Sequence, residues 1–247
     1  MIGGVKITSV NCAQAVDYVF ALATSRAGGF VTVTGAHGIV EAQTDPELKM
    51  ILNRAAMAVP DGMPVAWIGR AQGFPVSRVA GAELFSAIVQ DGRAQNLRHY
   101  FYGASPQILE TLISKVGQLV DPQAIVGFHA PPIRPPRALE DASIIAAMRD
   151  AAPDLIWVGL STPKQEYWMV NHEQFFPNAL LIGVGAAFDF AAGTAKRAPR
   201  IVQRMGMEWL YRLMREPARL WPRYRRVIPG MLWLIARDRW TGKSRVE

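Results

Sequence analysis

The sequence predicts an α/β fold with a mostly parallel sheet, followed by a basic, Trp-rich helical C-terminal appendage. Two apolar runs, residues 155–159 (LIWVG) and 179–184 (ALLIGV), contain no charged residue, as expected of strands buried on both faces. Strand patterns alternate with helical patterns along most of the chain, which favours crossover helices on a parallel sheet. With 247 residues, of which 50% are hydrophobic, the chain is long enough for a sizeable core.

The first half of the chain predicts two helix–strand units. A helical pattern over residues 12–25 precedes a β-branched strand over residues 30–34. Asp45 and Pro46 open the next helix, and a short strand at residues 58–59 stops at the turn Pro60-Asp61-Gly62. A lobe boundary is predicted near residues 91–97, where the sequence is DGRAQNL.

The second half continues the alternation. A strand over residues 98–102 leads through Gly103 into a helix over residues 107–116, and a strand over residues 125–128 leads into a Pro-rich loop over residues 131–136. Ligands of parallel sheets bind beyond the carboxyl ends of the strands. We therefore expect one site at that edge, which would collect Thr32, Asp61, Gly103, Ser161 and Asp189.

The charge of the chain lies almost entirely in its last part. Residues 196–247 hold twelve Arg and two Lys against four acidic residues, a net charge of +10, whereas residues 1–195 carry −3. Four of the seven Trp also lie after residue 195. We predict a catalytic domain over residues 1–195 and a basic amphipathic appendage over residues 196–247, broken into short helices at Pro217, Pro222 and Pro229. Such an appendage suits an anionic membrane surface or nucleic acid.

The sequence lacks the patterns of disulfide-bonded, secreted and membrane-spanning proteins. A single Cys12 excludes an intramolecular disulfide and predicts a cytoplasmic setting. The N-terminus lacks the shape of a signal peptide, and no apolar run approaches the ~20 residues of a membrane span. The chain is therefore expected to be soluble or bound to a membrane surface.

The glycine-rich segment does not predict a dinucleotide site. Gly183-Val184-Gly185-Ala186-Ala187-Phe188 has Phe at the third glycine position, and no acidic residue follows where a ribose contact would need one. A P-loop and an Asp-x-Asp pair are also absent, and the four His have no metal-ligand spacing. We expect no cofactor and no metal, with a diphosphate neutralised by Arg, Lys or backbone N–H groups.

Each candidate residue allows two interpretations. Asp61 suits a turn cap or a general base. Gln165 either follows the helix start at Pro163 and Lys164 or hydrogen-bonds a sugar or phosphate. Asp189 suits a satisfied loop residue or a site residue, and His37 suits a partly buried hydrogen-bonding residue or a catalytic one.

Seven segments taken in order resemble the WecG/TagA/CpsF glycosyltransferase family, from about Phe30 to Tyr224. They are Pro60-Asp61-Gly62, Arg78-Val79-Ala80-Gly81, PDLIWVGL at 153–160, Pro163-Lys164-Gln165-Glu166, GVGAAFD at 183–189, Arg197-Ala198-Pro199 and EWLYRL at 208–213. The resemblance implies a Rossmann-like fold. It also implies a metal-independent, inverting hexosyltransferase that moves a sugar from a UDP-sugar, a substrate, to a polyprenyl-diphosphate-linked saccharide. This reaction would serve cell-surface polysaccharide synthesis at the cytoplasmic face of the membrane.

The resemblance also assigns roles. It implies that Asp61 is the general base, that Thr32 lies beside a reacting sugar, and that Arg212, Arg219 and Arg223 hold the lipid diphosphate. Thr34 stands where many members carry Asn, which is more like the exopolysaccharide branch with its glucosyl transferases than the N-acetylmannosaminyl branch. The predicted substrate-binding residues are Thr34, His37, Gly103, Lys164, Gln165, Gly185, Asp189, Arg197, Arg212, Arg219 and Arg223.

Two other functions compete with this interpretation. A nucleic-acid-binding protein would use the +10 appendage on phosphates, but it leaves Asp61, Gln165 and Asp189 without a role, so no nucleic-acid partner is expected. A membrane-docked scaffold without catalysis is the second alternative. The Trp-rich appendage could also pack against a second copy in a homo-oligomer. Removal of the residues after about Lys196 is expected to leave a soluble fold with greatly reduced transfer.

Overall fold

The protein is an α/β domain built on one six-stranded, entirely parallel sheet. A computed structural model describes residues 1–240, with the backbone alone for residues 204 and 239; the last seven residues of the predicted appendage lie outside this range. The strands are β1 (Phe30–Thr34), β2 (Met57–Pro60), β3 (His99–Gly103), β4 (Ile125–His129), β5 (Leu155–Gly159) and β6 (Leu180–Gly183). The predicted fold class is confirmed.

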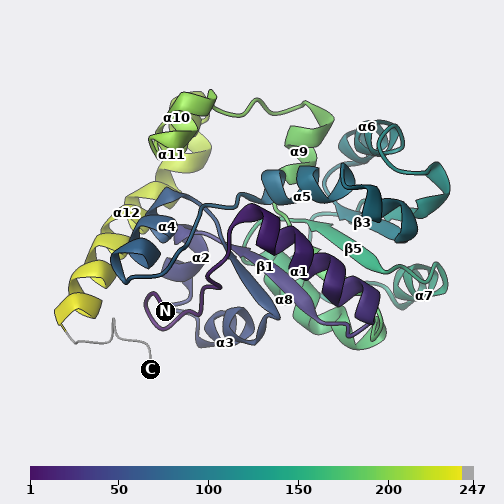
Figure 1. The fold of residues 1–247 in the computed structure, drawn as a ribbon, viewed down its shortest axis with the longest axis horizontal. Coiled ribbons are helices and arrows are strands. Elements are labelled where there is room, and N and C mark those ends of the chain that lie inside the picture. Colours follow the sequence, from purple (N-terminus) through teal and green to yellow (C-terminus); the bar gives the residue numbers. More distant parts are fainter. Residues whose placement is uncertain (241–247) are drawn as a thin grey trace.

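Twelve α-helices within the described range connect and cover these strands (Figure 1). They are α1 (Cys12–Ser25), α2 (Ala36–Glu41), α3 (Pro46–Arg54), α4 (Met63–Ala71), α5 (Gly81–Val89), α6 (Pro106–Val116), α7 (Ala142–Asp150), α8 (Lys164–His172), α9 (Ala187–Ala192), α10 (Arg200–Arg204), α11 (Glu208–Arg215) and α12 (Pro217–Trp240). Four of them begin with a side-chain cap: the side chains of Asn11, Asp45, Ser105 and Asp141 accept backbone N–H groups at the starts of α1, α3, α6 and α7.

The strand order β2-β1-β6-β5-β3-β4 decides which loops meet. β1 lies between β2 and β6, with Thr32 opposite Ala58 on one side and Gly183 on the other. Because all strands run the same way, the loops after β2, β1, β6 and β5 leave the sheet at the same edge. This is the edge at which the candidate residues were expected.

Two apolar clusters cover the two faces of the sheet. One contains buried residues of α1, α5, α6 and α9 together with Trp157 of β5, whose ring lies edge-on to Phe85 at a centroid distance of 4.9 Å. The other contains buried residues of α2, α3, α7, α8 and α12, together with Ile2 and Val5 from the N-terminus. Both faces are therefore buried, which explains the uninterrupted apolar strands.

The C-terminal region differs from the prediction. Pro217–Trp240 forms one helix, α12, that contains Pro222 and Pro229, so the predicted break into short helices is wrong. Each internal Pro removes one helical N–H, but Leu220, Val227, Met231 and Leu234 are buried along the same helix. Tertiary packing therefore outweighs the local cost of the two prolines.

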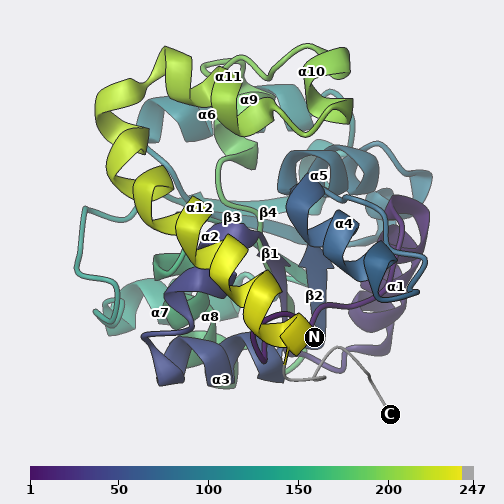
Figure 2. The ribbon, with the colours of Figure 1, turned by 90° about the vertical axis from the view of Figure 1, so that its left-hand side faces the viewer.

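α12 crosses the domain close to α2 (Figure 2). A Cβ added to Gly230 would stand 2.8 Å from Val40 Cγ1, so the helices approach closely because residue 230 has no side chain. At the far end of the helix, the Gly3 N–H donates to Asp238 Oδ2 over 2.8 Å. The C-terminal region is thus packed against the rest of the domain and against the N-terminus of the chain.

The segment of the predicted lobe boundary forms a short 3-10 helix, Gly92–Asn96. Ala94 and Leu97 are buried in the first apolar cluster. Strands before and after this segment belong to the same sheet. Residues 91–97 are therefore a connection within one sheet.

Candidate active site

Asp61 lies directly after β2 at the carboxyl edge of the sheet. Its N–H donates to Thr34 O over 3.1 Å, which ties it to the end of β1. The next residue, Gly62, is the N-cap of α4 and has φ of +81°, a conformation that favours glycine, and no side chain caps α4. Asp61 is therefore not the cap that one interpretation of the turn suggested.

The surroundings of Asp61 make it a weaker acid than usual. Burial raises its pKa to about 6, and the negative charge of Glu208 adds to this effect, while Arg78 and Arg212 oppose it. A carboxyl group with this pKa is ionised at neutral pH and holds a captured proton better than an ordinary Asp. This is the property that a general base needs.

Ion pairs hold the C-terminal helices next to Asp61. Arg78 forms an ion pair with Glu83 of α5 and a second, at 3.2 Å, with Glu208 of α11. Arg197 lies 3.2 Å from Glu83 and 3.9 Å from Glu208. Both Arg side chains also donate to Gln203 Oε1. Arg197, predicted to bind substrate, is therefore engaged in joining α5, α10 and α11.

Thr32 and Thr34 are buried on β1, on the face covered by α2 and α8. Their hydroxyl oxygens lie 2.9 Å apart and share a hydrogen bond. The structure thus places the pair next to Asp61, and Thr32 is fully buried. The role of Thr32 in catalysis stays a prediction.

Gln165 lies at the start of α8 and is almost fully buried. Its Oε1 accepts from the Gly185 N–H over 3.0 Å, and its Nε2 donates to Glu166 Oε1 over 3.0 Å. Gly185 has φ of +56°. The structure therefore joins two predicted residues, Gln165 and Gly185, across the loops after β5 and β6.

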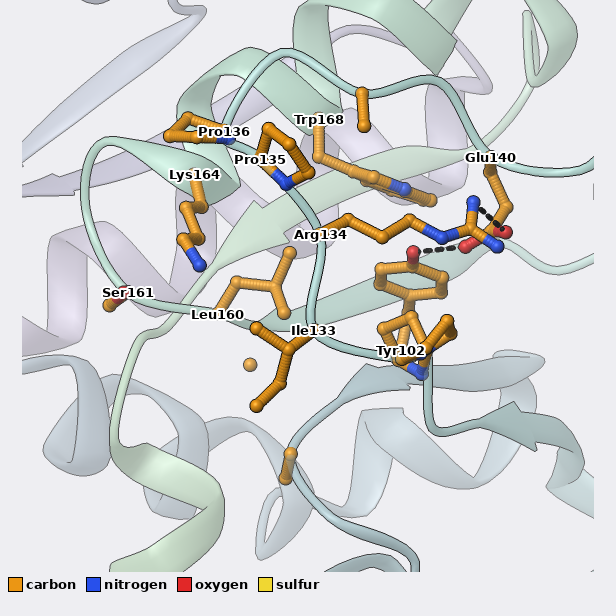
Figure 3. A pocket seen from close by; sticks show the side chains of 15 residues that line it. Tyr102, Ile133, Arg134, Pro135, Pro136, Glu140, Leu160, Ser161, Lys164 and Trp168 are labelled. Atoms are coloured by element: carbon orange, nitrogen blue, oxygen red, sulfur yellow. Dashed lines mark hydrogen bonds and ion pairs between the residues drawn. The ribbon is translucent and has the colours of Figure 1, made fainter.

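A pocket of about 240 Å³ opens over the ends of β3 and β5 (Figure 3). Tyr102 and Arg134 both point at Glu140, and Arg134 Nη1 lies 2.7 Å from Glu140 Oε1. Trp168 stacks on Tyr102 with a centroid distance of 4.1 Å. The predicted residue Lys164 lies at the other end of the pocket, near Ser161.

The predicted residue Gly103 lies at the end of β3, beside this pocket. The backbone conformation and the close approach of β5 require glycine at this position. Its φ is +121°, and an added Cβ would stand 2.6 Å from Gly159 O. Any side chain would therefore push β3 away from β5. Gly103 shapes the edge of the site through its small size.

Cationic side chains gather where α11 meets α12. The pKa of Arg223 is lowered, first by burial and then by the like charges of Arg212 and Arg219. Arg219 is paired with Glu216, whereas Arg212 and Arg223 have no carboxylate within ion-pair distance among residues 1–240. The structure thus brings the three predicted Arg residues together in one cationic cluster.

His37 lies on the first turn of α2, beside this cationic cluster. Burial, Arg223 and Arg226 lower its pKa to about 4, in that order of effect. Its Nε2 lies 3.4 Å from Glu41 Oε1. His37 is therefore neutral at physiological pH.

Asp189 lies in α9, and its carbonyl oxygen accepts the N–H groups of Thr194 and Ala195. Asp189 therefore lies in a short helix and not in the loop that one interpretation assumed. Arg197 and Arg212 both lie over the ring of its neighbour Phe190, each 5.8 Å from the centroid. Contact of the Asp189 side chain with a substrate stays a prediction.

Sequence reasoning missed several residues of the site. Arg78 and Glu208 stood in the recognised segments, but their effect on Asp61 depends on contacts between distant segments. Glu166 followed the noted Gln165, yet its burial had no local signal. Arg134 and Glu140 come from the connection between β4 and α7, which offered no motif.

Within residues 1–240, no three His, Cys, Asp or Glu side chains gather in a way that could hold a metal ion. No helix in the same range has the length and apolar character needed to cross a membrane.

Comparison with known proteins shows which family the chain belongs to. A sequence profile described as the glycosyl transferase WecG/TagA/CpsF family matches residues 1–245. A similar curated protein is the N-acetylglucosaminyldiphosphoundecaprenol N-acetyl-beta-D-mannosaminyltransferase of Bacillus spizizenii strain W23. The two are 32% identical over 193 residues, which cover 78% of this chain and 73% of the relative. The chain therefore belongs to the WecG/TagA/CpsF family of glycosyltransferases.

Proposed function

We propose that this protein is an inverting, metal-independent hexosyltransferase that moves a sugar from a UDP-sugar to a polyprenyl-diphosphate-linked saccharide. The observation that carries the proposal is the position of Asp61 directly after β2, where its side chain has a pKa raised to about 6. In a single displacement, Asp61 takes the proton of an acceptor hydroxyl. The hydroxyl oxygen bonds to the anomeric carbon, the bond from that carbon to the phosphate oxygen breaks, and UDP leaves with the electron pair.

The charges around Asp61 suit the phosphates of both substrates. The cluster of Arg212, Arg219 and Arg223 is cationic and lies on the side of α12 near His37. We assign it to the lipid diphosphate, because Arg side chains pair well with phosphate oxygens. Binding of an anion there also relieves the repulsion that lowers the pKa of Arg223.

We assign the pocket beside Lys164 to the nucleotide part of the donor. It offers a stacked aromatic pair, Tyr102 and Trp168, with Lys164 at its opposite end. The strand order sets it three strands away from Asp61, which is roughly 14 Å at a strand spacing of about 4.8 Å. A nucleotide in the pocket can therefore extend its sugar along the edge of the sheet towards the base.

The donor hexose is glucose or N-acetylmannosamine. The Bacillus relative is named as an N-acetylmannosaminyltransferase acting on N-acetylglucosaminyldiphosphoundecaprenol. Thr34 favours the glucosyl alternative. Its hydroxyl is hydrogen-bonded to Thr32 and so has fewer hydrogen bonds to give to a substrate than the longer amide of an Asn would have. By analogy with the relative, N-acetylglucosamine on a polyprenyl diphosphate is the first acceptor to test.

The outer face of α12 suits the surface of an anionic membrane, where such an acceptor resides. Trp221, Leu232 and Trp233 are exposed there, and Arg226 and Arg225 lie on the same helix, both exposed. Basic residues near an anionic surface contribute about 1 kcal/mol each, and exposed Trp residues favour the headgroup region. We therefore place the protein at the cytoplasmic face of the membrane as a peripheral protein.

A donor screen tests the proposed function. The protein is incubated with UDP-glucose, UDP-N-acetylmannosamine or UDP-glucuronate and a short-chain polyprenyl-diphosphate N-acetylglucosamine, with and without a chelator. We expect one UDP-hexose to yield an extended lipid by mass spectrometry, with an inverted anomeric centre by NMR and equal rates with chelator. Retention at the anomeric carbon, loss of activity with chelator, or no transfer from any UDP-sugar would each contradict the corresponding part of the proposal.

A further inference from the structure

Glu166 is a buried acidic residue for which the proposed reaction has no use. Only 1% of the residue is exposed. Its Oε1 accepts from Thr162 Oγ1 over 2.9 Å and from Gln165 Nε2 over 3.0 Å. Its Oε2 is buried and has no hydrogen-bond partner within the described part of the chain.

This arrangement fits a neutral carboxyl group. Burial raises the pKa of Glu166, because the ionised form with one unsatisfied oxygen would be very costly inside the protein. In the neutral form the proton belongs on Oε2, and Oε1 is left as a carbonyl oxygen with two lone pairs. The two lone pairs match the two donors, Thr162 and Gln165.

The hydrogen bonds continue from Glu166 into both neighbouring loops. Thr162 belongs to the loop after β5, and its Cγ2 would lie 3.5 Å from a Cβ added to Gly38 on α2. Gln165 extends the chain of hydrogen bonds to the loop after β6, because its Oε1 accepts a hydrogen bond from the Gly185 N–H. One carboxyl group therefore links the two loops on either side of the expected path of the donor.

Gln165 needs this partner to keep its orientation. A carboxamide can flip by exchanging its oxygen and its nitrogen. Here the flipped form would turn the NH₂ group towards the Gly185 N–H and the amide oxygen towards Glu166 Oε1, so that a donor faces a donor and an acceptor faces an acceptor. The side chain also lies against Gly183, where an added Cβ would stand 3.1 Å from Gln165 Cδ, so it has little room to adjust.

We propose that Glu166 is a positioning residue, which fixes the Gln165 carboxamide and the Thr162 hydroxyl and thereby holds the loops after β5 and β6 in the geometry for sugar transfer. This inference rests on the proposed function of the site. Glu166 acts through its hydrogen bonds and touches neither substrate. Its role depends on an acceptor oxygen and not on a negative charge.

Four variants test this inference by their kinetics: Glu166→Gln, Glu166→Met, Gln165→Met and the double variant Gln165→Met/Glu166→Met. Glu166→Gln keeps an acceptor oxygen, so it should transfer within about threefold of the wild type. Glu166→Met removes the acceptor and should lower kcat by about tenfold or more, as expected for buried donors left unpaired. The double variant should be no slower than Gln165→Met alone, because both changes break the same connection.

Hydrogen exchange at the Gly185 amide gives a readout that does not need activity. Glu166→Met should speed exchange at this amide, and Glu166→Gln should leave it protected. If Glu166→Met does not fold, Thr162→Val removes one donor to the same oxygen and should lower kcat with unchanged exchange at Gly185.

The inference is overturned if the two single effects multiply in the double variant. It is also overturned if Glu166→Gln is as slow as Glu166→Met, or if Glu166→Met only lowers the unfolding temperature. A wild-type protein that transfers no sugar would instead count against the proposed function, and the exchange measurement would still decide whether Glu166 holds Gln165.

Discussion

At the scale of single residues, the ionised form of Asp61, which acts as the base, makes the fold less stable than the neutral form does. Its pKa is raised to about 6, first by burial, so the fold favours the neutral form. Its contribution to stability is complete below the unfolded pKa of about 3.9 and is lost as the pH rises through about 6. We expect Asp61→Asn to unfold at a higher temperature than the wild type at pH 7.5, with the difference vanishing near pH 4. An equal or lower unfolding temperature at pH 7.5 would mean that Arg78 and Arg212 stabilise the charge more than burial opposes it.

Asp91 supplies a matched control with the opposite sign. Hydrogen bonds from Arg93 lower the pKa of Asp91 to about 2. Its contribution is present above the unfolded pKa and is lost as the pH falls towards 2. Asp91→Asn should therefore lower the unfolding temperature at pH 7.5, measured in the same thermal scans.

The sequence indicated the place of Asp61 but not its chemistry. A strand followed by Pro60-Asp61-Gly62 predicts a carboxylate at the edge of a parallel sheet. The raised pKa depends on burial and on Glu208, which lies almost 150 residues further along the chain. The same holds for Glu166, whose local pattern predicts only an acidic residue in the first turn of a helix.

At the scale of elements, the exposed face of α12 carries the proposed contact with the membrane. We expect the double variant Trp221→Ser/Leu232→Ser to bind vesicles of anionic lipid at least about tenfold more weakly, because burial of each side chain is worth roughly 1.5–3 kcal/mol. Flotation with vesicles measures the binding. Leu119→Ser is the control, because Leu119 is also exposed but follows α6 at the opposite side of the molecule (Figure 1). Wild-type binding by the double variant would contradict the assignment of this face.

Local patterns located most elements and failed where tertiary packing decides. Residues 12–25 and 155–159 coincide with α1 and β5, because amphipathic and fully apolar patterns report burial directly. Pro222 and Pro229 suggested helix breaks, but α12 continues through both. The contacts of Val227 and Met231 with the body of the protein had no signal in the local sequence.

At the scale of the whole molecule, the packing of α12 revises the expectation that the C-terminal region can be removed. Leu220, Val227, Met231 and Leu234 are buried, and loss of these four contacts could cost roughly 6–12 kcal/mol, which is comparable with the total stability of a domain. We expect a chain of residues 1–195 to show no cooperative thermal unfolding by circular dichroism. Arg219→Ala, which changes an exposed side chain, should unfold like the wild type. A cooperative transition of residues 1–195 near that of the full chain would show that the region is separable after all.

The sheet class followed from the sequence, whereas the strand order and the pocket did not. The order β2-β1-β6-β5-β3-β4 joins strands that are far apart in the chain. It sets Asp61 and Lys164 at one edge, and the loop after β4 adds Arg134 to the pocket. The recognised segments identified residues that belong to one site, but only the fold gives their distances and charges.

The rate of sugar transfer as a function of pH, measured for the wild type and for Asp61→Asn, tests the central claim most directly. The wild-type kcat should rise with pH through about 6 and then level off, because Asp61 must be ionised to accept a proton. Asp61→Asn should be slower by about a hundredfold or more and should lose this pH dependence. An Asp61→Asn protein that transfers sugar at the wild-type rate, with the same pH profile, would contradict the assignment of Asp61 as the base.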